Sequence, residues 1–340
     1  MERKEVNQMV VEATKADTSP ATSTGSAPSI NQPASSDAGR TALVRPKRPR
    51  EMQDWLNHYV YHPLAWQLAR RLAKTPITPN MVSVLGAMCV IAAGFAYWGL
   101  PWPVGAAVGM ALHMTWHVVD GADGDLARIT GKSSPIGEMV DGICDYVSHI
   151  VLYVILAQVL GAQIGLGTAW AWTLAAGLSH IVQSNHVEVQ RRFYQYWMYG
   201  VPFLHHSRQA AESAKQPKSG IGRVLDLVAD LYLRLAAGLT PHLDRVDRAV
   251  TAAKGDEVRM AAIRAEVTRE NRPLLLLLKF LGPNPRAIVL GLAMFAGSPL
   301  YYFIYQSIVL NVLMVFSVQL HNRASQRVAT RLQEAGLLAD

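Results

Sequence analysis

Two pairs of aspartates mark the segment that runs from residue 120 to residue 145. Asp120 and Asp123 are three positions apart at the end of one apolar stretch, and Asp141 and Asp145 are four positions apart at the start of the next. On a helix, both spacings place the two side chains on one face. Because the connection between the stretches is short, we expect neighbouring antiparallel helices whose four carboxylates converge near one point.

This cluster of carboxylates would be strongly repulsive without cations to compensate it. Mg²⁺ and Mn²⁺ prefer hard oxygen ligands, so we expect one of these metals, as a pair of ions, at the aspartates. Gly124 and Gly137 allow a ligand to come close, Arg128 offers a planar fork of donors to a diphosphate, and Lys132 adds a point charge. The pattern predicts displacement at phosphorus, with one carboxylate free to deprotonate an attacking hydroxyl.

The composition of the chain is that of an integral membrane protein. Half of its 340 residues are hydrophobic and only 17% are charged, whereas a soluble domain carries about 25% charge. The net charge is +7, and the basic residues lie in connections between apolar runs. This placement favours anionic membrane lipids as partners and argues against nucleic acid. The two cysteines, Cys89 and Cys144, lie in apolar segments and exclude a disulfide framework.

Six apolar stretches predict an all-α fold with six transmembrane helices. They are residues 81–99, 103–120, 138–160, 167–187, 286–298 and 299–320. A spanning helix needs about 20 residues, so the fifth stretch would be short or tilted. Lysine and arginine concentrate in alternate connections, which predicts that both termini and the aspartate segment are cytoplasmic, with a bacterial inner membrane as the location.

The remaining segments complete the predicted organisation. Residues 1–50 have the composition of a disordered basic tail, and residues 51–75 that of an amphipathic helix at the membrane interface. Residues 76–323 form the predicted six-span domain. Within it, residues 188–283 form a cytoplasmic helical insertion between the fourth and fifth spans, and residues 324–340 follow the domain as a cytoplasmic tail.

The aspartate segment resembles the signature of the CDP-alcohol phosphatidyltransferase family, D-x2-D-G-x2-A-R-x8-G-x3-D-x3-D. Every interval matches at Asp120, Asp123, Gly124, Ala127, Arg128, Gly137, Asp141 and Asp145. The six-span layout, the preceding interfacial helix and the "TPN" that ends at Asn80 resemble the family as well. The resemblance covers roughly residues 50–187 and 284–323.

The resemblance implies an enzyme of phospholipid biosynthesis. Such an enzyme transfers a phospho-alcohol from a CDP-alcohol to an acceptor hydroxyl and releases CMP. The resemblance implies Asp120, Asp123 and Asp141 as metal ligands, and Asp145 as both a ligand of the second metal and the general base. It implies contacts to the CDP group from Asp120, Gly124, Ala127, Arg128, Gly137 and Asp141. It also implies a homodimer.

Several assignments stay open on the sequence alone. Arg191, Arg192 and Arg286, like Lys132, either bind a substrate phosphate or anchor the helices to lipid headgroups, and Asn80 either contacts the nucleotide or caps its helix. We expect the histidines of the spans, such as His113, to be hydrogen-bonded core residues.

The substrates are open too. The donor is either CDP-diacylglycerol, with a polar alcohol as acceptor, or a CDP-linked headgroup, with a lipid hydroxyl as acceptor. Two rival classes also use acidic residues and divalent ions. One is an intramembrane prenyltransferase acting on a prenyl diphosphate, and the other is a divalent-cation transporter.

Overall fold

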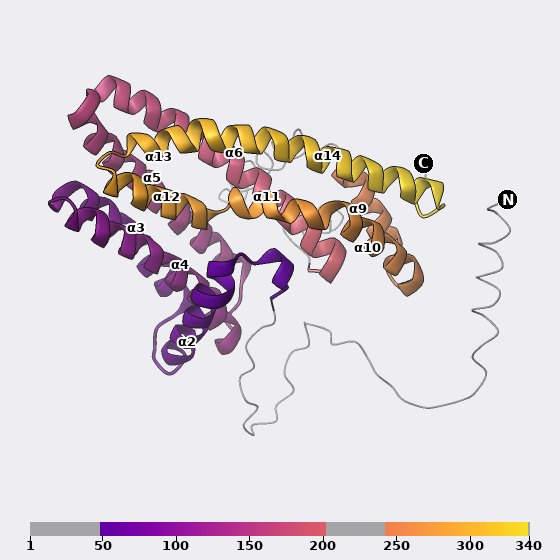
Figure 1. Cartoon of the computed structure of the whole chain (residues 1–340). Helices are drawn as coiled ribbons and strands as arrows, with labels where there is room; N and C mark the ends of the chain where they lie inside the picture. The colour runs from indigo at the N-terminus through magenta and orange to yellow at the C-terminus, as the bar shows by residue number, and fades with distance from the viewer. Residues whose placement is uncertain (1–47, 202–241, 339–340) are drawn as a thin grey trace, which may run out of the picture. The chain divides into compact units, whose positions relative to one another are not determined.

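The computed structural model describes residues 48–201 and 242–338, and every regular element in these ranges is a helix (Figure 1). The all-α class predicted from the sequence is therefore confirmed for these residues. Most of the predicted basic tail and residues 202–241 of the predicted insertion lie outside the described residues.

The first helical segment precedes the predicted spans. It consists of a 3₁₀ turn η1 (Arg50–Met52), a π-helical turn η2 (Asn57–Tyr61) and the helix α2 (His62–Leu72). Ala65 and Ala69 are completely buried on α2. A Cβ atom added to Gly121, which lies in the aspartate segment, would stand 3.2 Å from Ala65 Cβ. Small residues thus let α2 lie directly on the aspartate segment, while its position at a membrane interface stays a prediction.

Four long helices follow and hold the aspartate motif. They are α3 (Pro79–Gly99), α4 (Val104–Thr130), α5 (Pro135–Ile164) and α6 (Leu166–Tyr199). The α3 helix packs against both α4 and α5, and α5 packs against α6. Their common core combines large side chains such as Leu152 and Leu156 with small ones such as Ala93 and Ala169. The alternation of large and small residues lets the helix backbones approach closely.

The described part of the second half of the chain is also helical and packs against α4 and α6. Its elements are α9 (Leu243–Ala252), α10 (Glu257–Asn271), η3 (Arg272–Leu274), α11 (Leu275–Phe280), α12 (Pro283–Phe295), α13 (Leu300–Ile304), η4 (Tyr305–Val309) and α14 (Leu310–Glu334). The α12 helix packs on α4. The elements α13, η4 and α14 follow one another as a nearly continuous rod beside α6 (Figure 1).

A second apolar core lies where the ends of α6 and α14 meet α9, α10 and α11. Trp197, Val246, Ile263 and Val328 are buried there with at most 1% exposure. The described part of the predicted insertion is thus helical. The first part of the stretch predicted as a C-terminal tail, residues 324–334, belongs to α14 and packs into this core.

Four helical segments are long and apolar enough to cross a membrane. They are Pro79–Gly99, Gly137–Ile164, Glu257–Phe295 and Leu300–Glu334. Two predicted spans, on α4 and α6, are not among the four. Polar side chains lower the hydropathy of both helices: His113 and His117 lie on α4, and Gln183 and His186 on α6. The six-span count therefore stays a prediction.

Candidate functional site

The two halves of the aspartate motif are joined by a capped turn. Gly131, which follows α4, has the left-handed φ of 65° that favours glycine, and the N–H of Lys132 donates to Ala127 O at 2.9 Å. Ser134 then caps α5, because its hydroxyl accepts the N–H of Gly137 at 3.0 Å. Both helix ends next to the site are therefore defined by local hydrogen bonds.

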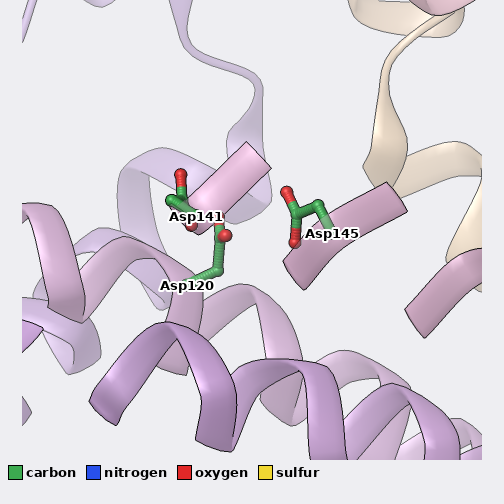
Figure 2. Close-up of side chains that lie close together, drawn as sticks. All are labelled: Asp120, Asp141 and Asp145. Atoms are coloured by element: carbon green, nitrogen blue, oxygen red, sulfur yellow. The ribbon is translucent and has the colours of Figure 1, made fainter. Parts of the chain in front are cut away.

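Three of the four predicted carboxylates meet across this turn. Asp120 on α4 faces Asp141 and Asp145 on α5 (Figure 2), and one oxygen of each lies within 4.8 Å of the other two. Among the described residues, no lysine or arginine forms an ion pair with these carboxylates, which we call the carboxylate trio. Oxygens on one Mg²⁺ lie at most about 4.2 Å apart, twice the metal–oxygen distance. Small side-chain rotations would bring the trio onto a shared divalent ion, so the residues fit the predicted metal.

The fourth predicted ligand, Asp123, is held differently. It is buried against α3, where Ser83 Oγ donates to its Oδ2 at 2.6 Å and the N–H of Gly124 donates to its Oδ1. Both oxygens of Asp123 therefore already accept a hydrogen bond. The structure places this residue next to the trio but not in it.

Asp145 is supported by two aromatic residues that the motif does not contain. Trp116 Nε1–H donates to Asp145 Oδ1 at 3.1 Å, and His149 Nδ1 lies 2.8 Å from the main-chain oxygen of Asp145. Since a carbonyl oxygen can only accept, Nδ1 of His149 carries a proton. The sequence held one signal for Trp116, which lies four positions before Asp120 and hence on the same face of α4.

Arg128 lies over the glycine that precedes it by one helical turn. A Cβ on Gly124 would stand 3.6 Å from both terminal nitrogens of Arg128, which is ordinary van der Waals contact. Arg128 also donates to Asp125, which is 2% exposed and accepts a second bond from Arg48 at 2.9 Å. Sequence reasoning missed Arg48, because its contact with Asp125 crosses 77 positions of the chain.

Asn80 and Gly137 come from different helices and meet at the same end of the site. A Cβ on Gly137 would stand 3.6 Å from Asn80 Oδ1. Thr78 caps α3 by accepting the N–H of Met81, at 3.4 Å. The cap of α3 is therefore Thr78 and not Asn80, and the amide of Asn80 forms no hydrogen bond within the described residues.

A cavity of about 630 Å³ begins at Asp120 and Asp145. Its wall on α4, α12 and α13 is mainly polar and includes His113, His117, Arg286 and Tyr302. Its wall on α5 and α6 carries large apolar side chains: Ile150, Val154, Leu174, Leu178 and Ile181. Asp120 and Asp145 of the trio therefore line a cavity that combines polar side chains, on α5 and α6 as well as on the other elements, with large apolar ones.

Arg286 is the buried cation of this cavity. It is 5% exposed and donates to Ser184 Oγ at 2.7 Å and to Gln183 Oε1 at 3.2 Å. Its Nε has no hydrogen-bond partner within the described residues. Buried charges are usually paired with an opposite charge. The neutral partners of Arg286 therefore leave its charge available to a ligand.

The other predicted phosphate-binding residues are less favourably placed. Arg191 lines the cavity but pairs with Glu188 at 2.8 Å, and Arg192 pairs with the same carboxylate at 2.5 Å. Lys132 is exposed on the turn between α4 and α5 and does not line the cavity.

Among the cavity histidines, His149 and His180 are hydrogen-bonded as expected, whereas His113 is not. His113 is 4% exposed, and neither of its ring nitrogens has a hydrogen-bond partner within the described part of the chain. His117 stacks on Tyr61 with ring centroids 4.9 Å apart, and its Nε2 also has no partner there. The expectation was therefore wrong for His113, because the ring lies where the helices leave a cavity and not where they pack.

Known proteins resemble the part of the chain that builds this site. Residues 76–196 match the family model described as CDP-alcohol phosphatidyltransferase. Choline/ethanolaminephosphotransferases 1 and 2 of Arabidopsis thaliana are each 30% identical to the chain over 146 residues, which are 41% of this chain and 36% of each relative. The chain thus matches little more than a third of the length of these curated relatives. The family match contains the whole aspartate motif and confirms the resemblance over residues 76–196.

Proposed function

We propose that this chain transfers a phospho-alcohol group from a CDP-alcohol to an acceptor hydroxyl, with the help of divalent ions. The acceptor oxygen bonds to the phosphorus that carries the alcohol, the bond from that phosphorus to CMP breaks, and the hydroxyl proton passes to a carboxylate. The observation that carries the proposal is the carboxylate trio, whose oxygens lie within 4.8 Å of one another at the end of a cavity. The family match over the same helices supports the reaction class.

The donor would lie across the two halves of the motif. Asp120, Asp141 and Asp145 would hold the divalent ions, which neutralise the charge of the diphosphate when bound. Arg128 would bind the diphosphate with its planar fork of donors. Gly124 lies beside that guanidinium.

Asp145 has the best position to take the proton of the acceptor. It lines the cavity, and the indole N–H of Trp116 fixes its Oδ1. An acceptor hydroxyl bound in the cavity would lie beside this carboxylate and that of Asp120. We therefore assign Asp145 a double role, as metal ligand and as general base.

We propose a lipid hydroxyl as the acceptor and a CDP-linked polar headgroup, such as CDP-choline or CDP-ethanolamine, as the donor. The names of the two plant relatives support this direction of transfer. The apolar wall of the cavity supports it too, because Ile150, Leu178 and Ile181 offer a surface to a hydrocarbon chain beside Asp145.

Arg286 would bind a polar oxygen next to the reacting hydroxyl of the acceptor. Its Nε lacks a partner in the described structure, and the residue lines the same cavity as Asp145. A buried donor left unpaired is costly, so an oxygen of the acceptor that satisfies it gains affinity. We expect Arg286→Gln to raise the KM for the acceptor about tenfold or more, with the KM for the donor little changed. The exposed Arg269, changed to Gln in the same way, serves as the control.

The direct test is a matrix of donors and acceptors with the full-length purified protein in lipid vesicles. CDP-choline, CDP-ethanolamine and CDP-diacylglycerol would each be offered with diacylglycerol or with glycerol phosphate, in the presence of Mg²⁺ or Mn²⁺. We expect release of CMP and a new phospholipid, identified by mass spectrometry, with a CDP-linked headgroup and diacylglycerol. Release of CMP only from CDP-diacylglycerol would reverse the assignment of the lipid substrate.

The same preparation separates the rival classes. Release of pyrophosphate from a prenyl diphosphate would favour the prenyltransferase. Uptake of divalent ions by vesicles without release of CMP from any donor would favour the transporter. No contact in the described structure favours either rival.

A further inference from the structure

One buried side chain of the cavity leaves both of its hydrogen-bonding groups unused. His113 on α4 is 4% exposed and lines the cavity, and neither Nδ1 nor Nε2 of its ring has a hydrogen-bond partner within the described residues. In either tautomer of a neutral imidazole, one nitrogen donates and the other accepts. Buried polar groups left unpaired oppose folding. His113 therefore has the properties of a residue whose hydrogen bonds a ligand completes.

The ring of His113 is held by other rings and not by hydrogen bonds. Its centroid lies 5.7 Å from that of Trp116, 5.7 Å from that of His149 and 6.3 Å from that of His117. The planes of His113 and His117 differ by only 3°, so these two rings are stacked along α4. Such contacts fix the imidazole before a ligand arrives, which reduces the entropy that binding would cost.

His113 lies on the same side of α4 as Asp120. Asp120 follows it by seven positions, which on a helix is close to two full turns and about 10 Å along the axis. Both residues line the cavity, as does Asp145. An acceptor whose hydroxyl lies at Asp145 can therefore reach His113 with a group several bonds farther along the molecule.

Polar neighbours of His113 on the cavity wall are already engaged with one another. Tyr153 Oη lies 3.0 Å from Tyr302 Oη and 3.2 Å from His180 Nδ1. All three of these residues line the cavity. His113 differs from them in that the chain supplies no hydrogen bond to its ring within the described residues.

The apolar part of the wall indicates what kind of molecule would bring an oxygen to His113. Ile150, Leu174 and Leu178 line the cavity and are also exposed on the outside of the helices. Hydrocarbon chains that pack against them would leave few polar groups to face the imidazole. The ester carbonyls of a diacylglycerol are such groups, because they accept hydrogen bonds and lie several bonds from the free hydroxyl.

We infer that His113 binds an ester carbonyl oxygen of the lipid acceptor and so gives this chain a preference for acyl-linked over alkyl-linked glycerolipids. This inference rests on the proposed function, because it takes the acceptor to be a diacylglycerol. The imidazole N–H donates to the carbonyl oxygen. An ether-linked lipid lacks that carbonyl and leaves the donor of His113 unpaired, which costs affinity.

The first test uses the full-length wild-type protein and needs no turnover. Dioctanoylglycerol and the matching dioctyl diether of glycerol would each be added to the purified protein in detergent, and the rise in melting temperature followed against lipid concentration. We expect the diester to act at about fivefold lower concentration than the diether, the effect of one hydrogen bond between neutral groups. The same midpoint for both lipids, or no rise with either, would contradict the inference.

Variants of His113 locate the preference at one side chain. His113→Leu removes both nitrogens, so affinity for the diester should fall about fivefold while the diether binds as before. Without lipid, its melting temperature should not fall, because an apolar group replaces an unpaired buried polar one. His113→Gln keeps an N–H donor and should retain part of the preference.

His186→Leu is the matched control for these variants. His186 is a buried histidine of α6, but its Nε2 lies 2.9 Å from Ser317 Oγ and it does not line the cavity. This variant should keep the full preference for the diester, even if the loss of its hydrogen bond lowers the melting temperature.

The inference and the proposed function fail in different ways. If His113→Leu is folded and keeps the wild-type preference, or loses affinity for diester and diether alike, His113 does not bind the carbonyl and the inference is wrong. If no CDP-alcohol releases CMP in the presence of diacylglycerol, the proposed reaction fails. A preference for the diester that is present in the wild type and lost in His113→Leu would support the inference even then.

Discussion

Two acidic regions of the molecule differ in how their charge is compensated. Between α10 and α14, Glu270 pairs with Arg327 at 2.6 Å and with Arg331 at 2.7 Å, and Glu266 pairs with Arg331 at 2.9 Å. Between α4 and α5, the carboxylate trio has no such partner within the described residues. The carboxylates of the first region are neutralised by arginines of the chain itself. Those of the second region have no such partner among the described residues, so a bound cation would have to supply the positive charge.

The difference separates ion pairs that stabilise the fold from carboxylates that a bound ligand would neutralise. Exposed ion pairs contribute about 0–1 kcal/mol each, so the α10–α14 network holds helices together with small increments. Partly buried like charges oppose folding unless something neutralises them. A chain that keeps three such groups in contact accepts a cost in stability, which a bound ligand would offset. The predictions below test this contrast.

The largest effect is expected in the trio itself. Asp145→Asn removes the proposed base and one metal ligand, so CMP release should fall by at least about 10²–10³, as for loss of other charge-stabilising groups. The melting temperature without divalent ions should not fall, because a repulsive charge has been removed. Activity assays and thermal unfolding check the two halves of the prediction. A variant that turned over at nearly the wild-type rate with saturating Mg²⁺ would contradict the base assignment.

Removal of divalent ions should have the next largest effect. EDTA should stop CMP release, and restoring Mg²⁺ or Mn²⁺ at about 100 times its dissociation constant should stabilise the fold by roughly 2.7 kcal/mol. Asp120→Asn combined with Asp141→Asn should abolish this metal-dependent rise in melting temperature. Glu270→Gln, which lies in the other acidic region, should keep it. An equal rise in both variants would place the ions elsewhere.

The compensated region should respond weakly. Glu270→Gln removes two ion pairs with arginines that are 51% and 31% exposed. We expect denaturant unfolding to show only a small loss of stability, as for other exposed ion pairs. CMP release should stay within about twofold of the wild type. A loss of activity as large as that of Asp145→Asn would erase the distinction between the two regions.

The smallest effect concerns pH and Glu51, whose carboxylate accepts hydrogen bonds from Tyr194 and Tyr199 on α6 and pairs with Arg272. Partial burial alone would raise the pKa of Glu51, but these partners lower it in the folded chain below its usual 4.5. Its stabilisation is therefore fully present above that value and is lost as the pH falls through the folded pKa. The melting temperatures of wild type and Glu51→Gln should therefore differ at pH 7. They should converge only below pH 4.5. A constant gap down to lower pH would show that the ionisation of Glu51 does not matter.

The sequence predicted the first four long helices well, because each contains an apolar run with clear ends. The predicted span 81–99 corresponds to Pro79–Gly99, and the predicted span 138–160 to Pro135–Ile164. The apolar stretches end earlier than their helices, which continue to Tyr199 in α6 and to Glu334 in α14. These extensions are stabilised by packing between distant segments, which no local periodicity reveals.

The site was predictable to the extent that one motif contains it. Fixed spacing on two helices was enough to bring Asp120, Asp141 and Asp145 together. The sequence could not show that Asp123 would be engaged by Ser83, or that Arg48 would reach Asp125. Both contacts join elements whose relative placement depends on the tertiary fold.

The capped turn between Gly131 and Ser134 has a consequence for how the chain tolerates insertions. A helix rotates by about 100° per residue. One residue added inside α5 ahead of Asp141 would therefore turn both of its aspartates away from Asp120. One residue added within the turn would only lengthen the connection between α4 and α5, because the ends of these helices are capped independently. Tolerance to insertions should therefore be low inside α5 and high within the turn. The reaction depends on how α5 is rotated relative to α4 and not on the sequence of the connection between them.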